Sequence, residues 1–95
     1  MSNDQLRIAL VELCDLLEAH GERAWSGWAR RTVGLVDEER FDRSRVRGVF
    51  GGMGSLNDVV IHPANGHTID AAEIHPVNQA VSKIRSRIYE ASATH

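Results

Sequence analysis

A glycine-dense stretch at residues 50–58 constrains this chain more than any other feature. It reads Phe-Gly-Gly-Met-Gly-Ser-Leu-Asn-Asp and is followed at once by the apolar run Val59-Val60-Ile61. Glycine adopts positive φ angles at little steric cost, so three glycines in four positions let the backbone turn sharply and pack closely. The segment before them has a helical pattern and the segment after them a strand pattern. We therefore predict that helices give way to a β-hairpin at this point.

Helical periodicity predicts two long helices and one short one before the glycines. The first runs from about Asn3 to His20, because leucines spaced three or four residues apart fall on one stripe, and Gly21 follows as a left-handed cap. The second spans about Glu22 to Val36. The third is shorter, from Asp37 or Asp42 to Phe50. The apolar stripes of the first two helices contain Leu6, Leu10, Leu13, Leu17, Trp25, Trp28, Ala29, Thr32, Val33 and Val36.

A hairpin and a last helix complete the prediction. A strand at about Leu56 to His62 leads to Asn65-Gly66, the usual pair for a type I′ turn, and a return strand covers His67 to Ile69. Pro76 then suits the first turn of a helix that continues to Ala91. The expected fold is mainly α within the α+β class: a bundle of about four helices in the order α-α-α-β-β-α, with the hairpin between helices three and four.

Size and composition predict an ordinary globular protein. The 95 residues form one expected domain, 1–95, with 42% hydrophobic and 25% charged residues, which argues against disorder. The net charge of −2 creates no general attraction to nucleic acid or membrane. The single Cys14 excludes an intramolecular disulfide. The start of the chain lacks the features of a signal peptide, and no apolar run is long enough to span a membrane, so we expect a cytoplasmic protein.

The stretch from Phe50 to Asp58, together with Val59-Val60 and the later Ile88-Tyr89-Glu90, resembles a family of small bacterial domains of unknown function. In that family a phenylalanine commonly occupies the position of Leu56. The similarity extends more loosely to the first helix and to the Trp25–Trp28 segment. Such domains look like those found near bacterial toxin systems, and the resemblance therefore suggests an immunity-type protein that neutralises a toxin.

The polar residues that follow the glycines are the first candidates for chemistry. The glycine loop precedes a strand pattern and no lysine follows it, so it is not typical of a phosphate-binding loop. Asn57 and Asp58 could bind a metal or act as a general base, but such residues more often hydrogen-bond neighbouring backbone amides and fix a loop. Both stay candidate binding residues.

Three histidines in or after the predicted hairpin require a geometric test. In the expected register, His62 and His67 are diagonal neighbours on one face, and His75 or Asp58 could add a ligand. Zinc needs three or four protein ligands, and no recognised spacing is present. A small metal-dependent hydrolase that uses Asp58, His62 and His67 is therefore an alternative function, while locally hydrogen-bonded histidines are the simpler interpretation.

The arginines near the third helix form a predicted basic patch. Arg40, Arg43 and Arg47 recur at i, i+3 and i+7, and Arg45 lies beside them. Acidic neighbours, the negative net charge and the lack of interleaved aromatic residues argue against nucleic-acid binding, which stays a second alternative. Solvated ion pairs or an acidic protein partner explain the pattern better.

Together these patterns favour a non-enzymatic protein-binding domain without a cofactor or metal. Its candidate contact residues are those discussed above: Arg40, Arg43, Arg47, Asn57, Asp58, His62 and His67. A toxin is the sharpest version of the protein partner. Ile8 and Val11 lie off the leucine stripe among charged positions, so we also predict a homodimer.

Overall fold

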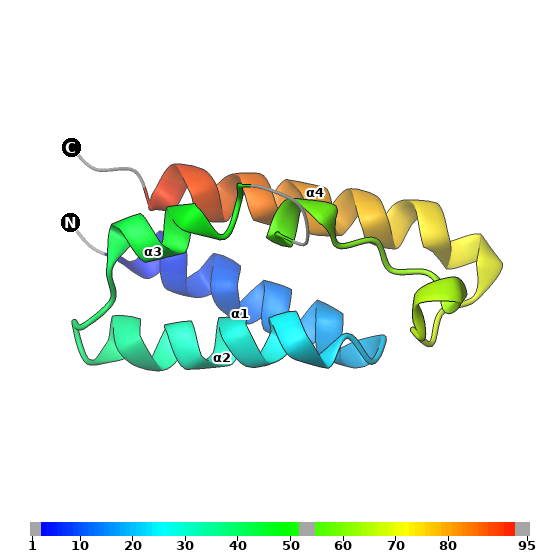
Figure 1. Ribbon diagram of the computed structural model, residues 1–95, viewed down its shortest axis with the longest axis horizontal. Helices are drawn as coiled ribbons and strands as arrows, with labels where there is room; N and C mark the ends of the chain where they lie inside the picture. The colour runs from blue at the N-terminus through cyan, green and yellow to red at the C-terminus, as the bar shows by residue number, and fades with distance from the viewer. Residues whose placement is uncertain (1–2, 52–54, 93–95) are drawn as a thin grey trace.

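The computed structural model describes residues 3–51 and 55–92 and shows four α-helices within them (Figure 1). The helices are α1 (Asp4–Ala19), α2 (Arg23–Asp37), α3 (Arg43–Gly48) and α4 (Ile74–Ala91). Three short 3₁₀ turns lie between α3 and α4: η1 (Leu56–Asp58), η2 (Pro63–Asn65) and η3 (Ala71–Glu73). None of the described helices is both long and apolar enough to cross a bilayer.

The two long helices predicted before the glycines are present as α1 and α2, and the turn between them follows from a single glycine. Gly21 has a φ of +80°. The amide of Glu22 donates to the carbonyl of Leu17 (2.9 Å), and the amide of Gly21 donates to that of Glu18 (3.1 Å). These two bonds form the Schellman end of a helix, which favours a residue with positive φ. The carboxylate of Glu22 then caps α2 by accepting from the amide of Trp25 (2.8 Å).

Helix α1 is central to the core and packs against both α2 and α4. Its predicted leucine stripe is fully buried. The irregular segment between α3 and α4 also contributes, because Leu56 and Ile61 are both 0% exposed. The buried apolar residues are Leu6, Ala9, Leu10, Leu13, Cys14, Leu17, Ala29, Val36, Val46, Leu56, Ile61, Val81, Ile84 and Ile88.

The predicted β-hairpin between helices three and four is wrong. The described residues contain no strand, so the order α-α-α-β-β-α and the α+β class are replaced by an all-helical fold. At the expected turn only Gly66 has a positive φ, of +83°, whereas a type I′ turn requires positive φ at Asn65 as well. Instead, η2 ends at Gly66, whose amide donates to the carbonyl of Pro63 (3.0 Å).

Side chains satisfy the backbone groups that a second strand would have bound. The amide of Ile61 donates to Oδ1 of Asn78 (2.8 Å), and Nδ2 of Asn78 donates to the carbonyl of Ile61 (2.9 Å). The amide of His62 donates to Nδ1 of His67 (3.1 Å). The extended run around Ile61 therefore packs on α4 without a partner strand.

Candidate functional site

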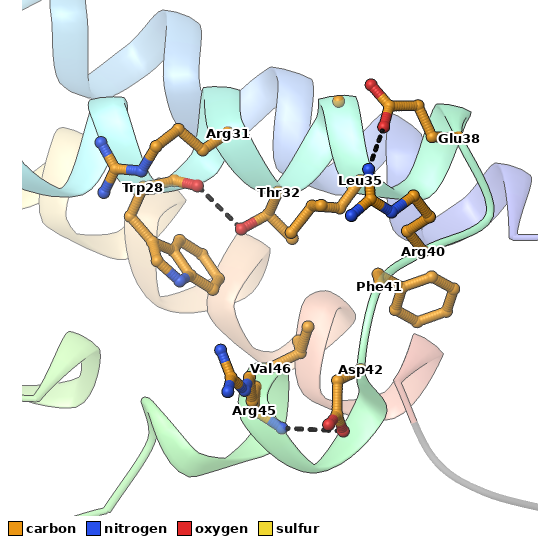
Figure 2. A pocket seen from close by; sticks show the side chains of 11 residues that line it. Trp28, Arg31, Thr32, Leu35, Glu38, Arg40, Phe41, Asp42, Arg45 and Val46 are labelled. Carbon is orange, nitrogen blue, oxygen red and sulfur yellow. Dashed lines mark hydrogen bonds and ion pairs between the residues drawn. The ribbon is translucent and has the colours of Figure 1, made fainter.

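A groove of about 720 Å³ lies between α2 and α3 (Figure 2). Residues from α2, from the loop after it and from α3 line it. They are Trp28, Arg31, Thr32, Gly34, Leu35, Glu38, Arg40, Phe41, Asp42, Arg45 and Val46. We call this feature the α2–α3 groove.

The chain reversal that forms the groove is encoded at two positions. Glu39, two residues after α2, has a φ of +57°, which turns the backbone away from the helix axis. Asp42 then starts α3, where its carboxylate accepts from the amides of Ser44 (2.8 Å) and Arg45 (3.4 Å). With only five residues between α2 and α3, the short helix lies back alongside the end of α2.

Apolar side chains form the floor of the α2–α3 groove. Trp28 projects from α2 toward α3, and Val46 projects from α3 toward α2 (Figure 2). Trp28 is half-buried and packs edge-on against Trp25, with ring centroids 5.6 Å apart. Leu35 is 40% exposed, which is high for a large aliphatic side chain. Phe41 lies at one end of the groove.

Charged side chains surround this floor, and two of them are not paired with any charged group among the described residues. Arg40 pairs with Glu38 (3.3 Å), and Asp42 is engaged as the cap of α3. By contrast, the guanidinium groups of Arg31 and Arg45 form no ion pair with the part of the chain that the structure describes. The groove therefore offers an apolar surface with free positive charge on two helices.

The three arginines of the predicted patch have different contact partners. Arg40 lies in the loop before α3 and joins the α2–α3 groove. Arg43 donates to Oδ1 of Asn3 (3.3 Å). Arg47 lies over the ring of Tyr89, 4.0 Å from its centroid, and donates to the carbonyl of that residue (3.3 Å). Arg47 is thus held against α4, whereas Arg43 also lies over the ring of Phe41, a groove residue, with its guanidinium carbon 5.2 Å from the ring centroid.

Asn57 and Asp58 lie in η1, within the segment that packs against α4. Nδ2 of Asn57 donates to the carbonyl of Phe50 (2.6 Å) and so links η1 to the residues just after α3. Arg85 reaches the same segment from α4 and donates to the carbonyls of Leu56 (3.2 Å) and Val59 (3.1 Å). Burial lowers the pKa of Arg85, while the nearby charge of Asp58 acts in the opposite direction.

The two predicted histidines form local hydrogen bonds. Nδ1 of His62 accepts from the amide of Ala64 (3.0 Å). Nδ1 of His67 accepts from the amide of His62, so its Nε2 carries the proton and donates to Glu22 (3.2 Å). Among the described residues, no three histidine, cysteine, aspartate or glutamate side chains lie close enough to hold a metal.

The sequence analysis did not identify the residues that hold the loop of residues 62–68 against the α1–α2 turn. Nδ1 of His20 donates to the carbonyl of Thr68 (2.7 Å), while the amide of Thr68 donates to the carbonyl of His20 (2.9 Å). Together with the Glu22–His67 contact, these bonds join residues 62–68 to the α1–α2 turn. Only Gly21 gave a local signal there, and it marked the turn but not its distant partner.

The sequence analysis also did not select Leu35 of the α2–α3 groove, although its position on the second helix contains a local signal of exposure. Leu35 lies at the edge of the apolar stripe, seven residues after Trp28 and four after Arg31. Charged residues lie one helical turn away on both sides, Arg31 and Glu38, and such charged neighbours are the local signal of an exposed apolar position.

The comparisons with known proteins identify one family. The profile of a family described as "Domain of unknown function (DUF6966)" matches residues 18–70, which is more than half of the chain. The matched segment contains every residue that lines the α2–α3 groove. No curated protein and no solved structure matches the chain.

Proposed function

The chain belongs to DUF6966, a family of domains of unknown function, and we propose that it is a non-enzymatic protein-binding domain whose contact surface is the α2–α3 groove. The observation that carries this proposal is the combination of an apolar floor with two guanidinium groups, those of Arg31 and Arg45, that have no ion pair within the described residues.

The chemistry of the groove defines the partner. Apolar side chains such as Leu35 gain about 25 cal/mol for each Å² removed from water on binding. Arginine and tryptophan are enriched among the residues that dominate interface energetics. Free positive charge beside an apolar floor favours a segment that carries an apolar anchor with carboxylates next to it. These charges would also accelerate association with an acidic surface.

An immunity-type protein that neutralises a bacterial toxin is the specific form of this proposal. The family resemblance of the Phe50–Asp58 stretch supports it. In that case the domain acts by occlusion: it covers an acidic surface of the toxin and needs no reactive group of its own.

The binding function can be tested without knowing the natural partner. A displayed library of random peptides is selected on the purified full chain, and the dissociation constants of the selected peptides are measured by calorimetry. We expect sequences with an aromatic or aliphatic residue flanked by aspartate or glutamate. Arg31→Glu and Arg45→Glu should each weaken binding by about tenfold or more.

The matched control is Arg23→Glu, which makes the same charge change at an exposed position of α2 outside the groove. It should retain nearly full affinity. Selection of peptides without acidic residues, or equal loss of affinity in all three variants, would show that the groove is not the binding surface.

A further inference from the structure

A second copy of this chain carries a surface that fits the α2–α3 groove. We propose that the groove of one copy binds the outward face of α1 of the next copy, so that the protein associates with itself head to tail. This inference rests on the proposed function, because it names one occupant of the same binding surface.

The outward face of α1 combines an exposed apolar side chain with carboxylates. Ile8 is 47% exposed, and Val11 beside it is half-buried. At about 100° per residue, Asp4, Ile8, Val11 and Asp15 fall within a sector of about 60°. We call these four residues the α1 stripe. An apolar anchor between carboxylates on a helix is the chemistry that the groove requires.

The charges are distributed unequally along the chain, with an acidic excess in α1 and a basic excess in the region that forms the groove. α1 contains four acidic residues and one arginine, whereas residues 23–48 contain seven arginines and four acidic residues. Two of the α1 carboxylates are already engaged, Glu12 by Arg87 and Glu18 by Arg30. Asp15 forms no ion pair with the described residues and is exposed. It is the carboxylate of the stripe best able to meet Arg31 or Arg45 of another copy.

The two surfaces cannot meet within one copy. The α1 stripe lies opposite the buried leucines of α1, while Val46 of α3 packs into the same core as those leucines. The stripe and the groove therefore face different directions. A contact between unlike surfaces leaves one groove and one stripe unused in each dimer, so association continues to longer chains or closes into a ring.

In this arrangement the α1 stripe of a neighbouring copy fills the groove when no other partner is bound. An acidic partner would compete with the α1 stripe of the neighbouring copy for Arg31 and Arg45. Partner binding should therefore shorten the assemblies, and self-association should weaken the apparent affinity for the partner.

The test uses two complementary variants of the full chain. One, Arg31→Glu with Arg45→Glu, removes the groove chemistry and keeps the α1 stripe. The other, Ile8→Ser with Asp15→Lys, removes the stripe and keeps the groove. In sedimentation equilibrium the unchanged protein should associate progressively with concentration, and each variant alone should be a monomer. An equimolar mixture should form a dimer and nothing larger, because it contains one functional groove and one functional stripe for each pair.

Three results would overturn the inference. A symmetric dimer that persists in the groove variant would show that α1 pairs with α1. A monomeric unchanged protein at all concentrations, or a mixture that stays monomeric, would show that the two surfaces do not bind each other. Circular dichroism of each variant serves as the control for folding. If the stripe variant still binds the selected acidic peptides, the proposed function stands even though the self-association fails.

Discussion

The side chain of Asn78 forms hydrogen bonds with both backbone polar groups of Ile61, at 2.8 Å to the amide and 2.9 Å to the carbonyl. Ile61 is 0% exposed, so neither of these groups can be satisfied by water. Nδ2 of Asn78 also donates to the carbonyl of Ile74 (2.7 Å). One side-chain amide thus anchors the segment between α3 and α4 to α4 itself.

We predict that Asn78→Ala lowers the free energy of unfolding by about 2–4 kcal/mol, because it leaves a buried donor and a buried acceptor unpaired. Urea denaturation followed by circular dichroism measures the change. Asn78→Asp should be at least as unstable as Asn78→Ala at neutral pH, because it places a carboxylate oxygen against the carbonyl oxygens of Ile61 and Ile74 in place of the donor.

Gln79→Ala is the matched control, because it truncates an exposed amide side chain at the next position of the same helix. It should change stability by no more than about 0.5 kcal/mol. Equal effects at Asn78 and Gln79 would contradict the anchoring role.

The same contact explains why the helices could be predicted and the hairpin could not. The leucine stripe of α1 and the glycine after it are local signals, and both led to the observed structure. The β-branched run Val59-Val60-Ile61 is an equally clear local signal for a β-strand. Its hydrogen-bond partner, however, is a side chain seventeen residues later, which no local pattern reveals. A run with strand propensity becomes a strand only when another strand supplies its partner.

The arginines of the candidate site could not be selected from the sequence for a related reason. Arg40, Arg43 and Arg47 share one face only if all three lie in a helix, and α3 begins at Arg43. Arg47 is drawn instead to Tyr89 of α4. The basic character of the region was visible in the sequence, whereas the choice of Arg31 and Arg45 depends on how α3 packs beside α2.

The end of α2 offers a stabilising substitution. Glu39 is in the left-handed region, with a φ of +57°, and it holds two helix-ending bonds: its amide donates to Val36 and the amide of Arg40 donates to Leu35. Glycine avoids the steric cost of this conformation. Glu39→Gly should therefore raise the free energy of unfolding by roughly 0.5–1 kcal/mol in the same assay.

Its control is Glu38→Gly, where φ is −91° and the side chain pairs with Arg40. That substitution removes an ion pair and gains no conformational relief, so it should lower stability. A gain at both positions would point to flexibility at the end of α2 rather than to the positive φ of Glu39.

Two bidentate ion pairs join α1 to its neighbours and predict the response to acid. Hydrogen bonds from Arg87 lower the pKa of Glu12, and hydrogen bonds from Arg7 lower the pKa of Asp37. A carboxyl group with a lowered pKa stabilises the fold above its unfolded pKa of about 4. The contribution disappears as the pH falls through the folded pKa.

Arg87→Gln should accordingly be less stable than the unchanged protein at neutral pH, and the difference should vanish in strong acid. The pKa of Glu12, measured by NMR titration of its side chain, should rise toward its ordinary value. Lys83→Gln, which removes an exposed charge from α4 without breaking an ion pair among the described residues, should produce no pH-dependent difference. A difference for Arg87→Gln that persists unchanged in acid would contradict this assignment.

Leu35 separates binding from stability in the α2–α3 groove. Because its side chain is 40% exposed, Leu35→Ala should lower the free energy of unfolding by no more than about 1 kcal/mol. The fully buried Leu10 is the contrast, and Leu10→Ala should cost about 2–5 kcal/mol.

Binding of the selected acidic peptides should show the opposite ranking. Leu35→Ala should weaken it by about tenfold through the lost burial of apolar surface, while Leu10→Ala should leave the affinity of the folded fraction nearly unchanged. Calorimetric titrations of both variants, at a temperature where each is folded, measure this. Unchanged peptide affinity in Leu35→Ala would remove the floor of the groove from the contact surface and leave only the arginines to explain binding.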